Sequence, residues 1–217
     1  MKDFSAGEPR YDMTVGAVSF LWKKASRLPS KTELEAALTH VGVGKVSIDG
    51  RVVTKADPLT RVDVGGAAKG FAADVIAEKL RDASVKSADI DLGGNLFMMG
   101  EHPDERPWRV SVRIPEGVEC EPIIVQVRDK SVVTSGNYER FVQIDGVRYT
   151  HIIDARTGWP VASDIVSATV ISGSSLQADL LATTALASGS SGLGALARRH
   201  PSCSFVAITG AGDVFRF

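Results

Sequence analysis

The sequence predicts an α+β fold built mostly on antiparallel sheet. Short segments of strand-like composition follow one another between turn residues, and only a few segments have helical periodicity. Two pairs of these segments are joined by Asp49-Gly50 and Asp145-Gly146, dipeptides that favour type I′ hairpins. Strands joined by hairpins are antiparallel, whereas parallel strands need a crossover helix. We therefore expect a few helices packed on antiparallel sheet rather than a doubly wound parallel fold.

Four segments carry helix signals. Ser30 and Glu33 occupy the two positions of a capping box, and apolar residues recur at helical spacing after them. Beyond Gly70, apolar residues form one face of a second helix. The expected helices lie between Ser30 and Gly42, at about 71–80, at about 175–188 and at 193–199.

The expected strands are short runs of apolar and β-branched residues bounded by Gly, Pro, Asn or Asp. In chain order they are 45–48, 51–54, 61–64, 88–92, 96–99, 108–114, 123–127, 132–134, 138–144, 147–153, 165–171, 204–209 and 214–217. No repeat, low-complexity tract or linker interrupts the chain. We therefore expect residues 1–217 to form one domain.

The composition restricts the classes of partner. The 217 residues are 44% hydrophobic, and 25 Lys and Arg face 26 Asp and Glu, for a net charge of −1. A nearly neutral chain has no broad attraction to nucleic acid or to an anionic membrane. Apolar runs are strand-sized and no secretory signal begins the chain, so we expect no membrane span and, as written, a cytoplasmic location. Cys120 and Cys203 are too few for a disulfide framework.

The segment 63–71, Asp-Val-Gly-Gly-Ala-Ala-Lys-Gly-Phe, stands at a predicted strand-to-helix junction. Its glycines let a phosphate approach the backbone, a helix N-terminus favours an anion, and Lys69 adds a positive charge. The segment matches neither G-x-G-x-x-G nor G-x-x-x-x-G-K-[ST]. It indicates either an anion site or an ordinary Gly-Gly turn with a solvated lysine.

A polar turn after a predicted strand offers a catalytic base. His151 leads into this turn, which contains Asp154 and Arg156, and a base at such a place is exposed to substrate. One alternative is a Ser-His-Asp hydrolase with Ser135 or Ser190 as nucleophile, although no G-x-S-x-G occurs. The other alternative is a hydrogen-bonded turn that carries no reaction.

A carboxylate and a hydroxyl share one face of the helix expected at 175–188. Asp179 and Thr183 are i, i+4 neighbours and can converge on one hard cation whose other ligands are carbonyls, water or phosphates. A solvated Asp and a helix-packing Thr explain the pair equally well.

In chain order, these segments resemble the motifs of the FAD:protein FMN transferase family, the ApbE-type flavin transferases. The match keeps the family's order from about residue 10 to 189. Its stretches are R-Y-D-M-T-V-G (10–16) with L-W (21–22), D-V-G-G-A-A-K-G-F-A-A-D (63–74), D-L-G-G-N (91–95), T-S-G-N-Y-E-R-F (134–141), H-I-I-D-A-R-T-G-W-P-V (151–161) and A-D-L-L-A-T (178–183). Several weak motifs in one order make a chance match improbable.

The resemblance implies an ApbE-like fold and an Mg²⁺-dependent enzyme that takes FAD, releases AMP and joins FMN to a Thr or Ser of a target protein. FAD and that target protein are the implied partners. Asp179 and Thr183 would bind Mg²⁺ through their side chains, together with a backbone carbonyl, that of Gly66, and His151 would deprotonate the acceptor hydroxyl. The implied FAD contacts are Arg10, Tyr11, Asp12, Asp63, Lys69 and the backbone of Ile152.

Two other functions remain open for the same motifs. In an FAD pyrophosphatase, water replaces the acceptor hydroxyl and the products are FMN and AMP. A non-catalytic FAD-binding module is the other possibility, because the chain starts almost at the family's first motif and is expected to be short at its N-terminus. Many family members are exported lipoproteins, which leaves the compartment open. The stretch 164–169, D-I-V-S-A-T, faintly resembles the acceptor sequence of flavinylated targets, and an alternating strand also explains it.

Overall fold

The computed structural model describes residues 1–8 and 10–217, and the contacts between residues divide the chain into two compact units. The small unit comprises Met1–Val64 and Asn137–Ala162, and the sheet unit comprises Gly65–Gly136 and Ser163–Phe217. This division describes contacts and does not test whether each unit folds independently. The single domain expected from the sequence therefore stays a prediction.

A six-stranded sheet forms the centre of the sheet unit, and every neighbouring pair of its strands is antiparallel. This confirms the predicted α+β class. The strand order is β12 (Val214–Arg216), β11 (Ser204–Thr209), β10 (Ile165–Ser172), β7 (Lys130–Gly136), β4 (Asn95–Met99) and β3 (Ala88–Asp91).

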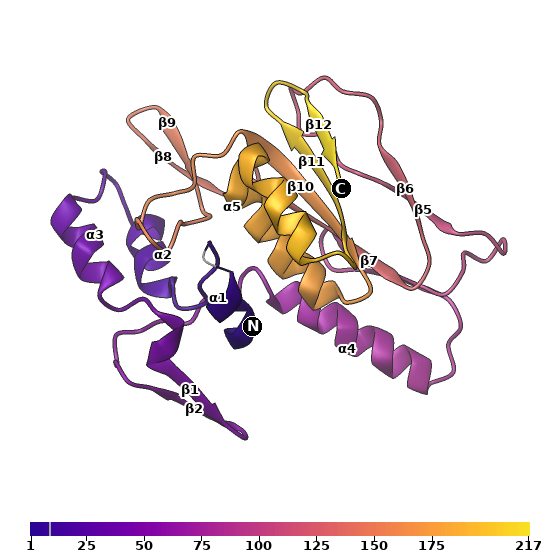
Figure 1. Ribbon diagram of the computed structural model, residues 1–217, viewed down its shortest axis with the longest axis horizontal. Helices are drawn as coiled ribbons and strands as arrows, with labels where there is room; N and C mark the ends of the chain where they lie inside the picture. The colour runs from indigo at the N-terminus through magenta and orange to yellow at the C-terminus, as the bar shows by residue number, and fades with distance from the viewer. Residues whose placement is uncertain (9) are drawn as a thin grey trace. The chain divides into compact units, whose positions relative to one another are not determined.

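Two helices, α4 (Ala68–Asp82) and α5 (Ser175–Arg199), cover one face of this sheet (Figure 1). Ala73 and Ala77 of α4 pack on Ile90, Phe97 and Met99 of the sheet. The other face carries a hairpin of β5 (Trp108–Ser111) and β6 (Ile124–Val127), which contributes to a separate apolar cluster. Both faces of the central strands are therefore covered, which explains why β10 is an almost continuous buried run.

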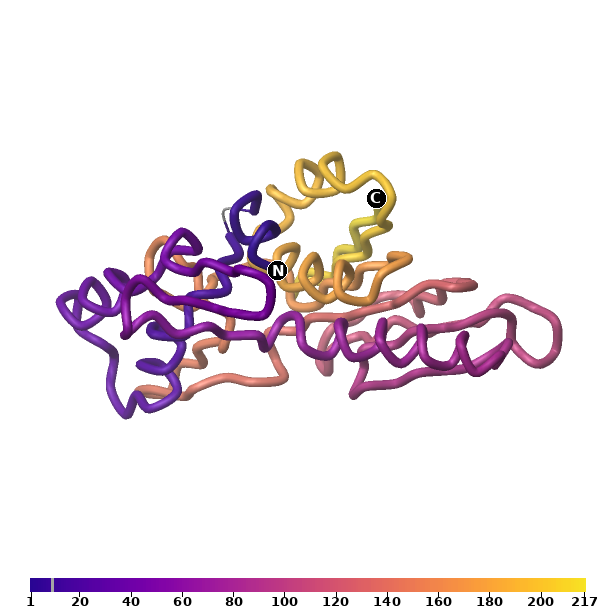
Figure 2. Tube along the Cα trace, turned by 90° about the horizontal axis from the view of Figure 1, so that it is seen from below, coloured from indigo at the N-terminus to yellow at the C-terminus, as the bar shows by residue number. Residues whose placement is uncertain are grey.

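Helix α5 is interrupted at Gly189, whose backbone (φ 67°, ψ 172°) is not helical. The chain changes direction there between the orange and yellow parts of the helix (Figure 2). The Asp164 carboxylate accepts a hydrogen bond from the Ser190 N–H and so caps the second segment. The two helices expected from the sequence are confirmed as the two segments of α5.

By length and composition alone, α5 could cross a membrane, and it is the one such helix in the described part of the chain. Half of its most apolar 18 residues are buried inside the protein, and core helices of folded proteins pass the same test. The helix is weak evidence for a span, so the expected absence of one stays a prediction.

The small unit is built from short helices and two hairpins. Its core contains Val18, Trp22, Leu34, Ile144 and Ile153, so residues from 137–162 pack against the N-terminal helices. The elements are α1 (Lys2–Gly7), α2 (Gly16–Lys23), α3 (Lys31–Leu38), the 3₁₀ turn η1 (Val43–Lys45), β1 (Val46–Asp49) with β2 (Val52–Lys55), and β8 (Phe141–Ile144) with β9 (Val147–Thr150).

The predicted capping box and one of the two predicted type I′ turns are confirmed, and the other turn is wrong. The capping box is confirmed, because Glu33 and Ser30 exchange side-chain to backbone hydrogen bonds. The type I′ turn is confirmed at Asp145-Gly146, where both residues have positive φ. It is wrong for the first hairpin, whose loop is Gly50-Arg51 with positive φ only at Gly50, as in a type II′ turn.

The strand expected at 61–64 is wrong. Arg61 forms only an isolated bridge with Val15, its carbonyl accepts the Gly16 N–H, and the Asp63 N–H donates to the Met13 carbonyl. A Cβ at Gly16 would lie 2.5 Å from the Arg61 carbonyl oxygen, so only glycine permits this approach. The segment therefore lies along the start of α2, a helix that was not predicted from the sequence.

Candidate functional site

The sheet unit holds a buried carboxylate on α5. Asp179 is 4% exposed, and its Oδ2 accepts a hydrogen bond of 2.9 Å from the backbone N–H of Gly70 in α4. Burial raises the pKa of Asp179, while the Gly70 N–H and the charge of Lys69 act in the opposite direction. Thr183 follows one helical turn later on the same face.

This carboxylate is suited to a divalent cation. Within residues 1–8 and 10–217, Gly70 is the one donor to Asp179, so most of the cost of burying its charge is uncompensated. The described residues contain no cluster of three or more His, Cys, Asp or Glu side chains that could hold a metal ion, so any cation here would need backbone, hydroxyl or substrate oxygens as well. One carboxylate, one hydroxyl and nearby carbonyls form a hard oxygen donor set, which fits Mg²⁺ completed by phosphate and water.

The turn before α4 contains the predicted Gly66 ligand and leads directly into the helix, whose N-cap residue makes no side-chain capping bond. The first turn of α4 contacts the turn at Gly93-Gly94, because Lys69 Nζ donates a hydrogen bond to the Gly93 carbonyl at 3.1 Å. Gly93 and Gly94 both have positive φ, and a Cβ on either would meet no atom within 4 Å. The structure thus joins the 63–71 and 91–95 motifs through Lys69.

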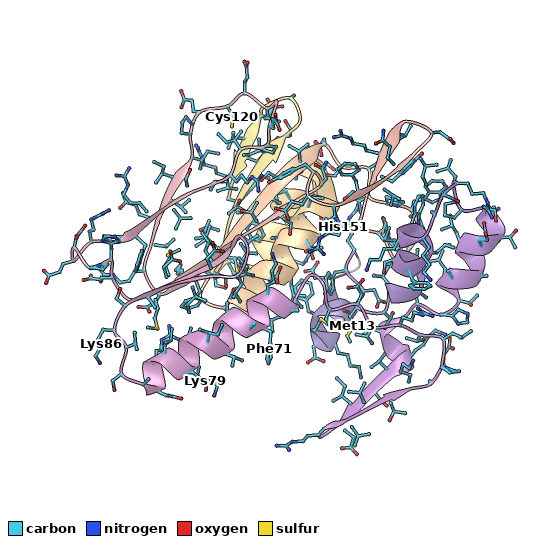
Figure 3. All side chains as sticks on the ribbon, turned by 180° about the vertical axis from the view of Figure 1, so that it is seen from behind. Met13, Phe71, Lys79, Lys86, Cys120 and His151 are labelled. Atoms are coloured by element: carbon cyan, nitrogen blue, oxygen red, sulfur yellow. The ribbon has the colours of Figure 1, made fainter. Side chains whose placement is uncertain are left out.

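His151, labelled in Figure 3, is the candidate base in the small unit. Its Nδ1 lies 3.0 Å from the Arg140 carbonyl, which also accepts the His151 backbone N–H at 3.1 Å. A carbonyl only accepts, so Nδ1 carries the proton in the neutral ring and Nε2 keeps its lone pair. The residue is at the surface, yet protein atoms around the ring exclude enough water to lower the pKa of His151; the nearby Arg140 charge also lowers it, against the Arg140 carbonyl, Glu139 and Asp63.

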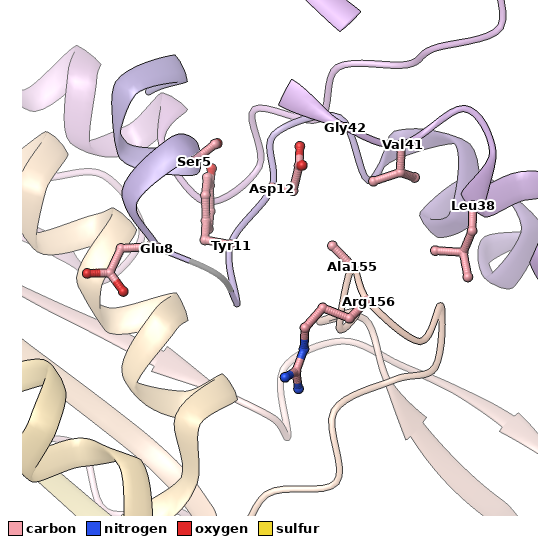
Figure 4. Close-up of a pocket in the computed structure, with 9 residues that line it drawn as sticks. All are labelled: Ser5, Glu8, Tyr11, Asp12, Leu38, Val41, Gly42, Ala155 and Arg156. Atoms are coloured by element: carbon pink, nitrogen blue, oxygen red, sulfur yellow. The ribbon is translucent and has the colours of Figure 1, made fainter. Parts of the chain in front are cut away.

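A cavity of about 350 Å³ opens beside Tyr11 and Asp12 in the small unit (Figure 4). The Asp12 carboxylate is already occupied, since Oδ1 accepts from the Thr14 N–H and hydroxyl and Oδ2 accepts from the Val43 N–H. These three bonds hold the Asp12 side chain in the loop, and the Asp12 carbonyl accepts the Val15 N–H. The cavity is lined by Ser5, Glu8, Tyr11, Asp12, Leu38, Val41, Gly42, Ala155 and Arg156.

The turn after His151 is held by its own side chains. Asp154 accepts hydrogen bonds from the backbone N–H and the guanidinium of Arg156, and these lower the pKa of Asp154. Arg10 Nη1 lies 3.9 Å from the same carboxylate. The interpretation of Asp154 and Arg156 as a hydrogen-bonded turn therefore fits the structure.

The remaining predicted FAD contacts also lie in the small unit. Asp63 Oδ2 accepts from the Ser19 hydroxyl at 3.1 Å and lies 3.9 Å from Lys23 Nζ. The Ile152 N–H makes a long 3.4 Å hydrogen bond to the Thr150 hydroxyl, while its carbonyl accepts from Val161. The predicted residues thus divide into Gly66, Lys69, Asp179 and Thr183 in the sheet unit, and Arg10, Tyr11, Asp12, Asp63, His151 and Ile152 in the small unit.

Two competing interpretations of single residues lose support. The Ser190 hydroxyl donates to Asp164, and Ser135 Oγ lies 3.3 Å from Thr183 Oγ1; among the residues that the structure describes, neither hydroxyl makes a hydrogen bond to a histidine, as a Ser-His-Asp nucleophile would. Thr169, the last residue of the acceptor-like stretch, is 1% exposed in a central strand. It is inaccessible for modification in the folded chain.

Two partners of the candidate cation site were not predicted from the sequence. The Gly70 N–H and the Ser135 hydroxyl contact Asp179 and Thr183 across 109 and 48 residues. Gly70 and Ser135 lie inside quoted motifs, which was the available signal, but motif order carries no information on pairing.

Comparison with known proteins finds the same family that the motifs resemble. The model of the ApbE family matches residues 5–206. The chain is 38% identical over 210 residues to the FAD:protein FMN transferase of Treponema pallidum (strain Nichols), covering 88% of this chain and 58% of that protein. It is 33% identical over 189 residues to that of Vibrio cholerae, covering 84% and 56%. The chain thus spans little more than half the length of these curated relatives.

Solved structures agree in fold. The apo form of the Pseudomonas stutzeri flavinyl transferase ApbE matches with a TM-score of 0.85 at 30% identity, over 100% of this chain and 69% of that one. An ApbE protein from Thermotoga maritima matches with a TM-score of 0.87 at 28% identity, over 99% and 72%. With the family model covering nearly the whole sequence, the chain belongs to the ApbE family.

Proposed function

We propose that this chain transfers FMN from FAD to a Thr or Ser hydroxyl of a target protein, depends on Mg²⁺ and releases AMP. The observation that carries the proposal is the Asp179 carboxylate, which is buried with a single hydrogen bond from the described residues and is followed by Thr183 one turn later. Membership of the ApbE family supports it, as do the relatives named FAD:protein FMN transferase.

The sheet unit supplies the residues for the pyrophosphate. Asp179, Thr183 and the Gly66 carbonyl would hold Mg²⁺, which when bound neutralises phosphate charge and eases departure of AMP. Lys69 would bind a phosphate oxygen in place of the Gly93 carbonyl that it contacts in this structure. The side chain needs only to exchange one oxygen acceptor for a charged one.

The small unit supplies the base. His151 Nε2 accepts the proton of the acceptor hydroxyl, while Nδ1–H remains bonded to the Arg140 carbonyl. The acceptor oxygen forms a bond to the FMN phosphorus, and the bond from that phosphorus to the bridging oxygen breaks, so AMP leaves with the electron pair. A lowered pKa keeps His151 neutral, and therefore able to accept a proton, at neutral pH.

The test is a transfer assay. The purified chain is incubated with FAD, Mg²⁺ and a target domain, and mass spectrometry measures covalent FMN on the target and free AMP. His151→Ala and Asp179→Ala should abolish the adduct, while His102→Ala is the matched control because His102 packs on Trp108 in the sheet unit. Adduct formed equally well by the Asp179→Ala protein would show that the metal assignment is wrong.

A second candidate, an FAD pyrophosphatase, uses the same residues. The surface position of His151 favours it, because water can reach the ring and take the place of the acceptor hydroxyl. Free FMN released with AMP when no target is present would identify this reaction. FAD binding in a calorimetric titration without AMP release would instead indicate a non-catalytic FAD-binding module.

A further inference from the structure

Ser135 places a second hydroxyl against the proposed metal ligand Thr183. Along β7, Ser131 bonds Ser175 at the start of α5, whereas Thr134 bonds Thr169 of the neighbouring strand. Side chains alternate along a strand, so Ser135 lies on the same face as Ser131, under α5. Its Oγ is 3.3 Å from Thr183 Oγ1.

The Thr183 hydroxyl has two weak acceptors for its proton. Besides Ser135, the Asp179 backbone carbonyl also lies 3.3 Å from Thr183 Oγ1. Both distances are longer than the roughly 2.7–2.8 Å usual between hydroxyl oxygens and their partners. Neither contact alone fixes the hydroxyl, so its lone pairs can take more than one direction.

A hydroxyl that binds a cation must direct a lone pair at the metal and its proton elsewhere. Ser135 can accept that proton and still has its own proton to donate. Among the residues that the structure describes, Thr183 is the one hydrogen-bond partner of the Ser135 hydroxyl. The proton of the Ser135 hydroxyl would therefore remain available to a water molecule or a phosphate oxygen at the site.

We infer that Ser135 is a positioning residue of the cation site. Its hydroxyl accepts a hydrogen bond from the Thr183 hydroxyl and so directs a lone pair of Thr183 Oγ1 at Mg²⁺. This inference rests on the proposed function, in which Thr183 is a metal ligand. It gives the Thr-Ser-Gly motif of β7 a role that does not require Ser135 to be a nucleophile. Partners of this kind commonly change metal affinity by about 10–100-fold when removed.

The test is Mg²⁺ affinity, measured by calorimetric titration of the FAD-loaded chain. Ser135→Ala should weaken Mg²⁺ binding by about 10-fold, and Ser135→Thr, which keeps the hydroxyl, should restore it. Thr134→Val is the matched control: it removes a hydroxyl from the same strand but from the opposite face. Circular dichroism verifies that each variant is folded.

A double variant tests the route of the effect. If Ser135 acts through Thr183, Ser135→Ala should have no further effect on Mg²⁺ affinity in a Thr183→Val background. Unchanged affinity in folded Ser135→Ala, or losses that simply add in the double variant, would overturn the inference. If Asp179→Asn binds Mg²⁺ as tightly as the unmodified chain, the metal site itself is wrong, and that result is separate from any effect at Ser135.

Discussion

Gly70 lies where α4 crosses the start of α5, and replacing it with alanine should damage both the fold and the cation site. A Cβ on Gly70 would lie 2.4 Å from the Ser175 carbonyl oxygen and 2.7 Å from the Leu176 Cα. Both neighbours are backbone atoms, which cannot move away as the end of a side chain can. The same residue donates its N–H to the buried Asp179 carboxylate.

The size of the effect follows from the distances. Ordinary van der Waals contact begins at 3.4 Å, so the helices would have to separate by about 1 Å. Overpacking of this kind costs about 1–3 kcal/mol. Weakening a hydrogen bond to a charged group costs about 1.5–3 kcal/mol more, and the better helix propensity of alanine returns about 1 kcal/mol. We expect Gly70→Ala to lower the free energy of unfolding by about 3 kcal/mol.

The assay is equilibrium urea denaturation followed by far-UV circular dichroism, with Gly194→Ala as the matched control. Gly194 is a glycine inside the other helix, α5, but its Cβ would meet only side-chain atoms of Phe217 and Arg198, at 3.5 Å and beyond. That variant should be as stable as the unmodified chain or up to about 1 kcal/mol more stable. If Gly70→Ala unfolds at the same urea concentration as Gly194→Ala, the close approach of the helices is not what requires glycine at position 70.

Three further predictions concern a helix cap, the base and the metal ligand. Ser30→Ala should lower the free energy of unfolding by about 1 kcal/mol in urea, because it removes the side-chain oxygen that accepts the Glu33 N–H; an unchanged midpoint would contradict this. Lowering the pH should slow FMN transfer only below about 6.5, the usual histidine pKa. Protonated His151 cannot accept a proton, and burial lowers the pKa at which it becomes protonated. A pH profile in which kcat/KM already falls above that value would contradict the assignment of His151 as the base. Asp179→Asn should raise the melting temperature without Mg²⁺, because it removes a buried charge with one hydrogen bond, and should abolish the Mg²⁺-induced shift; a melting temperature that still rises with Mg²⁺ would argue against Asp179 as the ligand.

Local chemistry explains which elements could be predicted from the sequence. The Ser30 capping box needs only residues three positions apart, and the Asp145-Gly146 turn needs only two adjacent residues that accept positive φ. The Asp49-Gly50 prediction failed because cross-strand pairing shifted the loop by one residue to Gly50-Arg51. Helix α2 was missed because it is only eight residues long and its N-cap residue, Val15, makes no side-chain capping bond, whereas the uncapped but longer α4 still shows a periodic apolar face.

By itself, the sequence determined the α+β class, the two segments of α5, the placement of the motifs and the resemblance to one enzyme family. The fold class and the helix segments depend on composition and periodicity, whereas the resemblance depends on the motifs and their order along the chain. Only the tertiary structure decided that the Gly70 N–H meets Asp179, that Lys69 contacts the Gly93 carbonyl and that Ser135 faces Thr183. The physical reason is that each of these contacts joins residues far apart in sequence, and each needs a close helix approach or a sheet register that packing of the whole unit sets.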